Sequence, residues 1–240
     1  MTYPLSGPEA DSSHEEVLDP RVAEVLNPEE TAIIVVDVMD AYCDPEAPLP
    51  RHLRETEGLT VEHMDAVADA IVVFLAASRQ YPMAATVFTR MAERPETSPP
   101  SIRLKMEVDG SPPVAEENGI GWNYYRVNPQ PGDYQLKKPN YDAFLGTELD
   151  HYLRARGVKT TIIIGGWTSV CIDTTARTSA QLGYNTLVPA DLIAGPELPG
   201  SPQTPETTRR QLSTISEVMG YMPLAKTILG VWEQSGADPT

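Results

Sequence analysis

The sequence predicts a three-layer α/β fold in which helices cover both faces of a mainly parallel sheet. Short apolar segments of strand length alternate with segments of helical periodicity, which is the order typical of parallel sheets with helical crossovers. The first apolar segment, residues 32–36, is continuously hydrophobic, as expected for a strand buried on both faces. With 240 residues, 41% of them hydrophobic, the chain can bury one substantial core, and it contains no internal repeat.

The first half of the chain predicts an arm, a strand, a helix, a second strand and a long loop. Residues 1–30 predict an irregular N-terminal arm with a short helix at about residues 21–26, and residues 31–240 predict one folded domain. Residues 61–79 carry apolar side chains at helical spacing, and residues 84–89 read as the next strand. Residues 91–133 are rich in proline, glycine and charge, and so predict one long loop of the kind that usually forms a lid or binds a ligand.

The second half returns to regular alternation. Strands are predicted at residues 134–137, 161–164 and 185–188, and helices at residues 147–156, at 171–182, at 205–218 and at 224–234. Gly165 and Gly166 are expected to end the strand before them, and Ser169 to cap the helix that begins just before Cys171. Gly157 is expected to close the helix that precedes this strand.

Charge and cysteine content exclude several classes of partner. The chain has 34 acidic and 18 basic residues, a net charge of -16, and no basic patch interleaved with aromatic residues, so we expect neither nucleic acid nor anionic membrane as partner. The first thirty residues have no apolar stretch, so neither a signal peptide nor a membrane anchor is predicted. The two cysteines, Cys43 and Cys171, form no disulfide framework, which fits a cytoplasmic protein with free thiols.

Three chemically active side chains each follow a predicted strand. Asp37, Lys138 and Cys171 lie at strand ends, where ligands of parallel sheets bind. At a helix start, backbone N–H groups and the helix dipole should lower the pKa of the Cys171 thiol from roughly 8.5 toward neutrality. Asp37 can accept the thiol proton, Lys138 can hold both groups by charge, and N–H groups at Cys171 and the Gly166–Trp167 turn can stabilise an oxyanion. A lone buried cysteine is more often structural, so the joint occurrence of the three carries the prediction.

Three motifs then indicate a family. They are Ile34-Val-Val-Asp-Val-Met-Asp-Ala-Tyr-Cys43, Lys138-Pro-Asn-Tyr-Asp-Ala-Phe144, and the segment from Gly165 to Arg177. In this order they resemble the isochorismatase-like cysteine hydrolase superfamily, and the resemblance runs from about residue 30 to the C-terminus. It implies a central, mainly parallel six-stranded sheet, no cofactor, and assembly as a homodimer or homotetramer.

The resemblance also implies roles for the site residues. Asp37 would be the general base and later the acid, Lys138 its electrostatic partner and Cys171 the nucleophile. A cis peptide at Gly166–Trp167 would aim the Trp167 N–H into an oxyanion hole shared with the Cys171 N–H. The reaction would be hydrolysis of a carbon–nitrogen bond through a thioester, with no metal.

Departures from the family pattern narrow the activity. Met39 and Asp40 replace a Gln and an Asn that usually follow the catalytic aspartate, and Trp167 stands where a small residue is common. Residues 89–93 lack the Asp-Trp-His type of metal ligands found in nicotinamidases, so no metal is predicted. The presence of Cys171 argues against the vinyl ether chemistry of true isochorismatases.

The remaining branch acts on small linear amides and carbamoyl compounds, such as biuret, triuret, ureidoacrylate, N-carbamoyl amino acids and maleamate. The residues predicted to bind substrate are Tyr42, Trp122, Gly166, Trp167 and Gln211. Trp122 could also wall the site of a neighbouring subunit or simply pack its loop, and Gln211 could be an exposed helix residue. Arg90 could either bind a carboxylate of the substrate or pair with an acidic residue on the surface. Cys43 is interpreted as a packing residue. Two alternatives also remain open: an amidase for a bulkier amide or lactam, framed by the 91–133 loop, and a non-catalytic ligand-binding member.

Overall fold

The computed structural model describes residues 18–92, 98–112, 114 and 117–235, so part of the predicted arm and parts of the 91–133 segment lie outside the described residues. The described chain begins with helix α1 (Pro20–Glu24), close to the short helix predicted there. Asp19 caps this helix by accepting a hydrogen bond from the Arg21 N–H. A single 3-10 turn, η1 (Pro28–Glu30), then leads into the sheet.

The sheet has six strands, and all of its strand pairs are parallel. The strands are β1 (Thr31–Val36), β2 (Ala85–Met91), β3 (Tyr134–Lys138), β4 (Thr160–Gly166), β5 (Asn185–Leu187) and β6 (Ile193–Ala194). Their order is β3-β2-β1-β4-β5, and the two-residue β6 pairs with the end of β4. The predicted fold class is therefore confirmed, and β6 is the strand that was not predicted individually.

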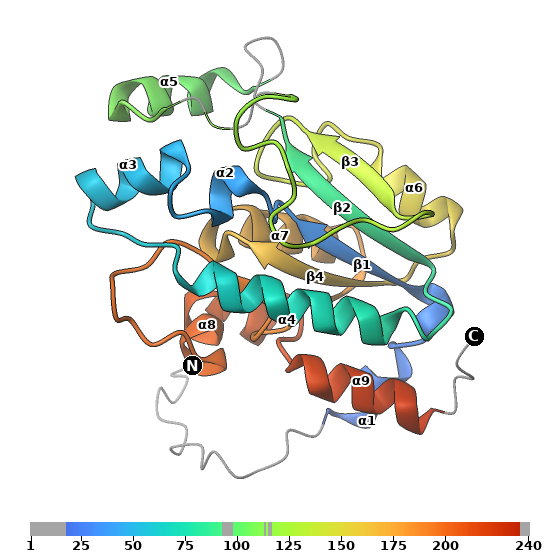
Figure 1. Cartoon of the computed structure of the whole chain (residues 1–240). Coiled ribbons are helices and arrows are strands. Elements are labelled where there is room, and N and C mark those ends of the chain that lie inside the picture. The colour runs from blue at the N-terminus through green and yellow to red at the C-terminus, as the bar shows by residue number, and fades with distance from the viewer. Residues whose placement is uncertain (1–17, 93–97, 113, 115–116, 236–240) are drawn as a thin grey trace, which may run out of the picture.

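Two hydrophobic cores, one on each face of the sheet, make the three layers. Alternate side chains of β1 enter different cores, Ile33 and Val35 one and Ile34 and Val36 the other, because successive residues of a strand point to opposite faces. The helices of the first core are α4 (His63–Ser78) and α9 (Ala225–Gln234), and those of the second are α6 (Leu149–Ala155) and α7 (Asp173–Gln181). Figure 1 shows α4 on the near side of the sheet, α9 below α4, and α7 behind the sheet.

The two glycines after residue 164 extend β4 instead of ending it, which corrects the prediction. A side chain at Gly165, whose φ is +116°, would place its Cβ 2.3 Å from the Val36 carbonyl oxygen of the neighbouring strand. Glycine therefore lets the backbone pass close to β1 at this point. The chain continues into a π-helical turn, η2 (Thr168–Ile172), so Ser169 lies inside the turn and does not cap it.

Three helices beyond the strand ends were not predicted. They are α2 (Asp40–Cys43), α3 (Pro48–Thr56) and α5 (Pro100–Asp109), and Figure 1 shows them beyond the carboxyl ends of β1 and β2. The prediction that residues 91–133 form an irregular loop is thus wrong where α5 forms. Pro100, one of the prolines that suggested the loop, stands at the first position of α5, where a helix tolerates proline, and Gly110 (φ +66°) closes the helix. Pro48 stands in the same way at the first position of α3.

The C-terminal part is close to the prediction. The segment 205–218 divides into α8 (Pro205–Gln211) and a π-helical turn, η3 (Ile215–Met219), and Thr204 caps α8 by accepting from the Thr207 N–H. Trp232 of α9 is fully buried and donates through Nε1 to the Leu26 carbonyl at 2.7 Å, which fixes α9 against the start of the chain. Within the described ranges, every helix is too short or too polar to cross a membrane.

Candidate active site

Asp37, Lys138 and Cys171 come together at the carboxyl edge of the sheet. Asp37 follows β1, Lys138 ends β3, and Cys171 lies in η2 directly after β4. The Lys138 Nζ is 2.7 Å from Asp37 Oδ2 and donates a hydrogen bond to Cys171 Sγ at 3.4 Å. All three are buried, with 0%, 1% and 6% of Lys138, Asp37 and Cys171 exposed. A thiol, a carboxylate and an ammonium therefore meet in a site that is largely shielded from water.

The loop after β3 holds the Lys138 ammonium in place. Lys138 Nζ donates to the Asn140 carbonyl at 2.8 Å, and the Asn140 side chain in turn accepts from the Asp142 N–H and donates to the Leu145 carbonyl. Burial lowers the pKa of Lys138, but the charge of Asp37 and contact with Cys171 raise it by more, so the pKa lies above its usual range. The side chain is therefore a fixed cation between the other two groups.

Thr89 of β2 fixes the Asp37 carboxylate. Its hydroxyl donates to Asp37 Oδ1 at 2.7 Å and accepts from the Asp37 backbone N–H at 3.1 Å. These bonds hold Asp37 in a left-handed conformation, φ +48°, which is uncommon for residues other than glycine. Sequence reasoning missed this contact. The two residues are 52 positions apart, so the local sequence carries no signal for the pair.

The Cys171 thiol is neutral in this arrangement. Burial raises its pKa to about 12, and the Asp37 carboxylate adds to the increase, while the Lys138 ammonium opposes it. This is the reverse of the lowered pKa predicted from the position at a helix start. Loss of water around the sulfur outweighs the favourable charges, so ionisation of the thiol requires a base, and Asp37 lies beside it.

A cavity of about 170 Å³ opens onto the Asp37 carboxylate and the Cys171 thiol. Among the described residues, its lining is Asp37, Tyr42, Leu49, Met91, Lys105, Met106, Asp109, Ser111, Val114, Tyr141, Gly166, Trp167, Val170 and Cys171. The lining thus includes the thiol, the carboxylate and three of the five residues that were predicted to bind substrate. Pockets for drug-sized ligands are usually several hundred Å³, so this cavity suits a smaller molecule.

Trp167 forms a fixed wall of the cavity. Its indole Nε1 donates to the Tyr42 carbonyl at 2.9 Å, and the two rings meet edge to face with centroids 5.5 Å apart. The Gly166–Trp167 peptide bond is cis, at the position that the family resemblance implied. The indole ties η2 to α2, so Trp167 and Tyr42 act as one aromatic surface beside the sulfur.

Trp122 and Gln211 lie elsewhere among the described residues. Trp122 is buried beside β2, where the Arg90 guanidinium lies 5.1 Å from its ring centroid and 3.9 Å from that of Tyr124. Arg90 also donates to Gln135, so its stacking fits neither of the two roles considered for it. Gln211 donates to Glu197 at 2.9 Å on the surface. Neither residue lines the cavity of its own chain. Their contacts instead fit the alternatives of packing for Trp122 and of a surface position for Gln211.

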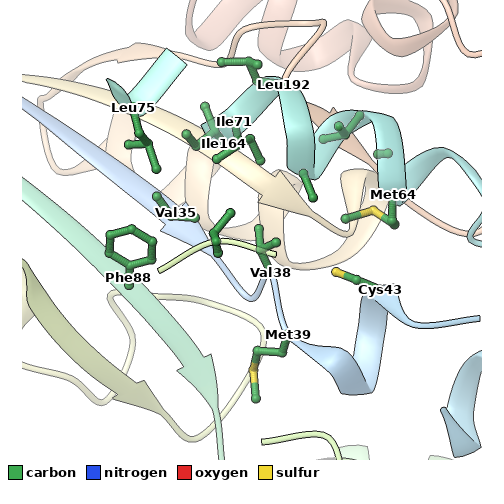
Figure 2. Close-up of a cluster of buried hydrophobic side chains, with 14 of the residues drawn as sticks. Val35, Val38, Met39, Cys43, Met64, Ile71, Leu75, Phe88, Ile164 and Leu192 are labelled. Atoms are coloured by element: carbon green, nitrogen blue, oxygen red, sulfur yellow. The ribbon is translucent and has the colours of Figure 1, made fainter. Parts of the chain in front are cut away.

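Met39 and Asp40, the residues next to Asp37 that depart from the family pattern, do not line the cavity. Met39 is fully buried in the core on the α4 face, with Cys43 in the same cluster, as Figure 2 shows. The Cys43 thiol is raised in pKa by burial, in keeping with a packing role. Asp40 is half-buried and bonded to the Asn123 side chain, and burial raises its pKa. These positions therefore support α2, and they do not alter the cavity wall.

In the part of the chain that the structure describes, no three His, Cys, Asp or Glu side chains lie close enough together to hold a metal ion. Of the segment 89–93, Thr89 is engaged with Asp37, and Glu93 is outside the described residues. Metal independence remains a prediction from the sequence.

Comparisons with known proteins agree with this geometry. A family model described as the isochorismatase domain matches residues 31–215, which include all of the strands and the three converging side chains. The chain belongs to the isochorismatase family. Ureidoacrylate amidohydrolase of Methylobacterium radiotolerans is 31% identical over 224 residues, covering 82% of this chain and 82% of that protein. The same enzyme of Azorhizobium caulinodans is 30% identical over 188 residues, covering 70% and 79%.

Solved structures of the family have the same fold. A cysteine hydrolase from Pseudomonas syringae pv. phaseolicola superposes with a TM-score of 0.72 at 26% identity, covering 93% of this chain and 99% of that one. N-carbamoylsarcosine amidase from Thermoplasma acidophilum superposes with a TM-score of 0.62 at 19% identity, covering 82% and 96%, which shows the fold alone. Together with the amidohydrolase relatives, the family match shows that this chain is a hydrolase acting on carbon–nitrogen bonds.

Proposed function

We propose that this family member hydrolyses small amides or ureido compounds through a thioester on Cys171. The observation that carries the proposal is the contact of one buried ammonium, Lys138, with both Asp37 at 2.7 Å and the sulfur at 3.4 Å, at a cavity. A purely structural cysteine would need neither a buried carboxylate nor a buried ammonium beside it, and burying such charges is costly. The relatives named ureidoacrylate amidohydrolase support a ureido or amide carbonyl as the electrophile.

The first half of the reaction forms the thioester. Because the thiol is neutral at rest, Asp37 takes its proton as the sulfur attacks the carbonyl carbon. The oxyanion that forms would be stabilised by the backbone N–H groups of Trp167 and Cys171. Collapse of this intermediate breaks the carbon–nitrogen bond, and the leaving nitrogen takes the proton from Asp37 and departs as ammonia or an amine.

The second half regenerates the thiol. Asp37, again a carboxylate, accepts a proton from water as the water oxygen attacks the thioester carbonyl. The carbon–sulfur bond then breaks, and the sulfur recovers the proton from Asp37 while the acid product leaves. Lys138 keeps its charge throughout, because its pKa is above the usual range, and it stabilises the negative charge on whichever partner carries it.

The size of the cavity favours this reading over the bulkier amide or lactam, since about 170 Å³ leaves little room beyond a few carbon atoms next to the carbonyl. The non-catalytic alternative was suggested by Met39, Asp40 and Trp167. It loses support because Met39 and Asp40 do not line the cavity, while Trp167 lines it without blocking it. A cytoplasmic location and a homodimer or homotetramer belong to the same proposal; cell fractionation and light scattering test them.

The decisive experiment is ammonia release from a panel of biuret, triuret, ureidoacrylate, maleamate, N-carbamoyl amino acids and larger amides. We expect turnover of at least one small member and an adduct mass on Cys171 when the reaction is quenched with acid. Cys171→Ala should abolish turnover while its circular dichroism matches that of wild type, and Cys43→Ala, the other buried cysteine, serves as the control. Full activity of Cys171→Ala would refute the mechanism.

A further inference from the structure

Helix α5 contributes two charged side chains to the lining of the cavity. Lys105 and Asp109 of α5 both line the cavity and form an ion pair one helical turn apart. The Lys105 side chain is 71% exposed, whereas Asp37 and Cys171 are at most 6% exposed. The reacting groups thus belong to the buried part of the cavity lining, and Lys105 belongs to the part that is open to solvent.

Most of the remaining lining is apolar, namely Leu49, Met91, Met106, Val114, Gly166, Trp167 and Val170. Tyr42, Ser111 and Tyr141, which carry hydroxyls, complete it. A polar or charged substituent placed against the apolar part of the lining would lose its water without gaining a partner, at a cost of about 1–3 kcal/mol for a neutral group and more for a charge. A ligand that fits therefore has a short, poorly solvated middle, a reactive carbonyl at one end and any charge at the other end.

The sign of that charge follows from the lining. Among the described lining residues, Lys105 is the one cation, and Asp37 and Asp109 are the acids. The chain as a whole carries a net charge of -16, which repels anions at long range, so an anion is favoured where a local ammonium offsets that repulsion. Asp109 is 41% exposed and can return to water when another carboxylate takes its place on Lys105.

We propose that Lys105 is a specificity-determining residue that binds a carboxylate at the far end of the substrate. The substrates are then small ureido or amido carboxylates in which a short carbon chain separates the scissile carbonyl from the carboxylate. This inference rests on the proposed function and adds the charge and layout of the substrate to it. Ureidoacrylate, the compound in the enzyme name of the two relatives, has this layout. Its ureido group and its carboxylate are joined by two unsaturated carbons.

The test compares an anionic substrate with its neutral counterpart, 3-ureidoacrylate with its methyl ester, by ammonia release. We expect Lys105→Met to lower kcat/KM for the acid by about fivefold, mainly through KM, and to leave the ester unchanged, because a remote ion pair contributes to binding and not to the chemical step. Lys105→Arg, which keeps the charge, should restore most of the preference. Asp109→Asn should raise kcat/KM for the acid, because the competing carboxylate is gone.

The matched control is Lys159→Met. Lys159 is also an exposed, ion-paired lysine, bonded to Glu30, but it precedes β4 at the opposite edge of the sheet. Lys159→Met changes the net charge by the same amount as Lys105→Met. The ratio of turnover of the acid to turnover of the ester should nevertheless stay that of wild type.

The outcomes separate this inference from the proposed function. Equal effects of Lys105→Met on acid and ester, or no effect on either, would overturn the role of Lys105. Turnover of neutral amides alone by wild type would also overturn it and leave the proposed function standing. Failure of wild type to release ammonia from any amide would overturn the proposed function itself.

Discussion

Replacement of Thr89 by valine tests how far the catalytic base depends on a neighbouring strand. Valine has nearly the shape of threonine, so the change keeps the packing of this fully buried position while it removes both hydrogen bonds to Asp37. The carboxylate loses a donor at 2.7 Å and the Asp37 backbone N–H loses an acceptor at 3.1 Å. Asp37 is then free to leave its left-handed conformation and to move away from the sulfur.

The magnitude follows from the charge of the acceptor. A hydrogen bond to a charged group contributes about 1.5–3 kcal/mol. If that stabilisation orients the base in the transition state, its loss lowers kcat by roughly 10- to 150-fold, at 1.36 kcal/mol per factor of ten. KM should change little, because Thr89 is not among the described residues that line the cavity.

The assay is steady-state ammonia release with the best substrate of the panel, together with urea unfolding of each variant. Thr89→Ser keeps the hydroxyl and should recover most of kcat. Thr160→Val is the matched control, since Thr160 is also fully buried and its hydroxyl donates to the Val25 carbonyl at the opposite end of the sheet. It should lose stability and keep kcat. The reasoning fails if Thr89→Val retains wild-type kcat, or if Thr160→Val loses as much.

Two further predictions concern the charges at the sulfur. Lys138→Met leaves the Asp37 carboxylate buried without its cation, so the free energy of unfolding should fall by about 3–5 kcal/mol. The double variant with Asp37→Leu should regain much of this stability without regaining activity. Urea unfolding that finds Lys138→Met as stable as wild type would contradict this prediction. The Asp37 carboxylate helps to raise the Cys171 pKa to about 12, so Asp37→Asn should lower that pKa and speed alkylation of Cys171 by iodoacetamide near pH 8, as followed by peptide mass, even though turnover is lost. Cys43 is the internal reference, and slower labelling of Cys171 in the variant would contradict the predicted sign.

The local sequence determined the sheet and the three strand-end residues. The continuous apolar run at residues 32–36 is confirmed as the central strand β1, because a strand covered on both faces must be apolar at every position. The predicted strand ends alone placed Asp37, Lys138 and Cys171 at one edge of the sheet, since parallel strands align their carboxyl ends. The motifs around them were sufficient to indicate the family to which the chain belongs.

Tertiary structure decided how these residues act and what surrounds them. The pKa of Cys171 depends on how much water the packed chain removes, so its rise to about 12 could not be read from a helix start. The contact of Thr89 with Asp37 joins residues 52 positions apart, and a single sequence has no local signal for such a pair. The sequence left Trp122 open between a substrate wall and loop packing, and the structure packs it beside β2. Lys105, in an expected loop, lines the cavity from α5. Local periodicity reports which side of an element is buried, but only the folded chain decides which partners meet there.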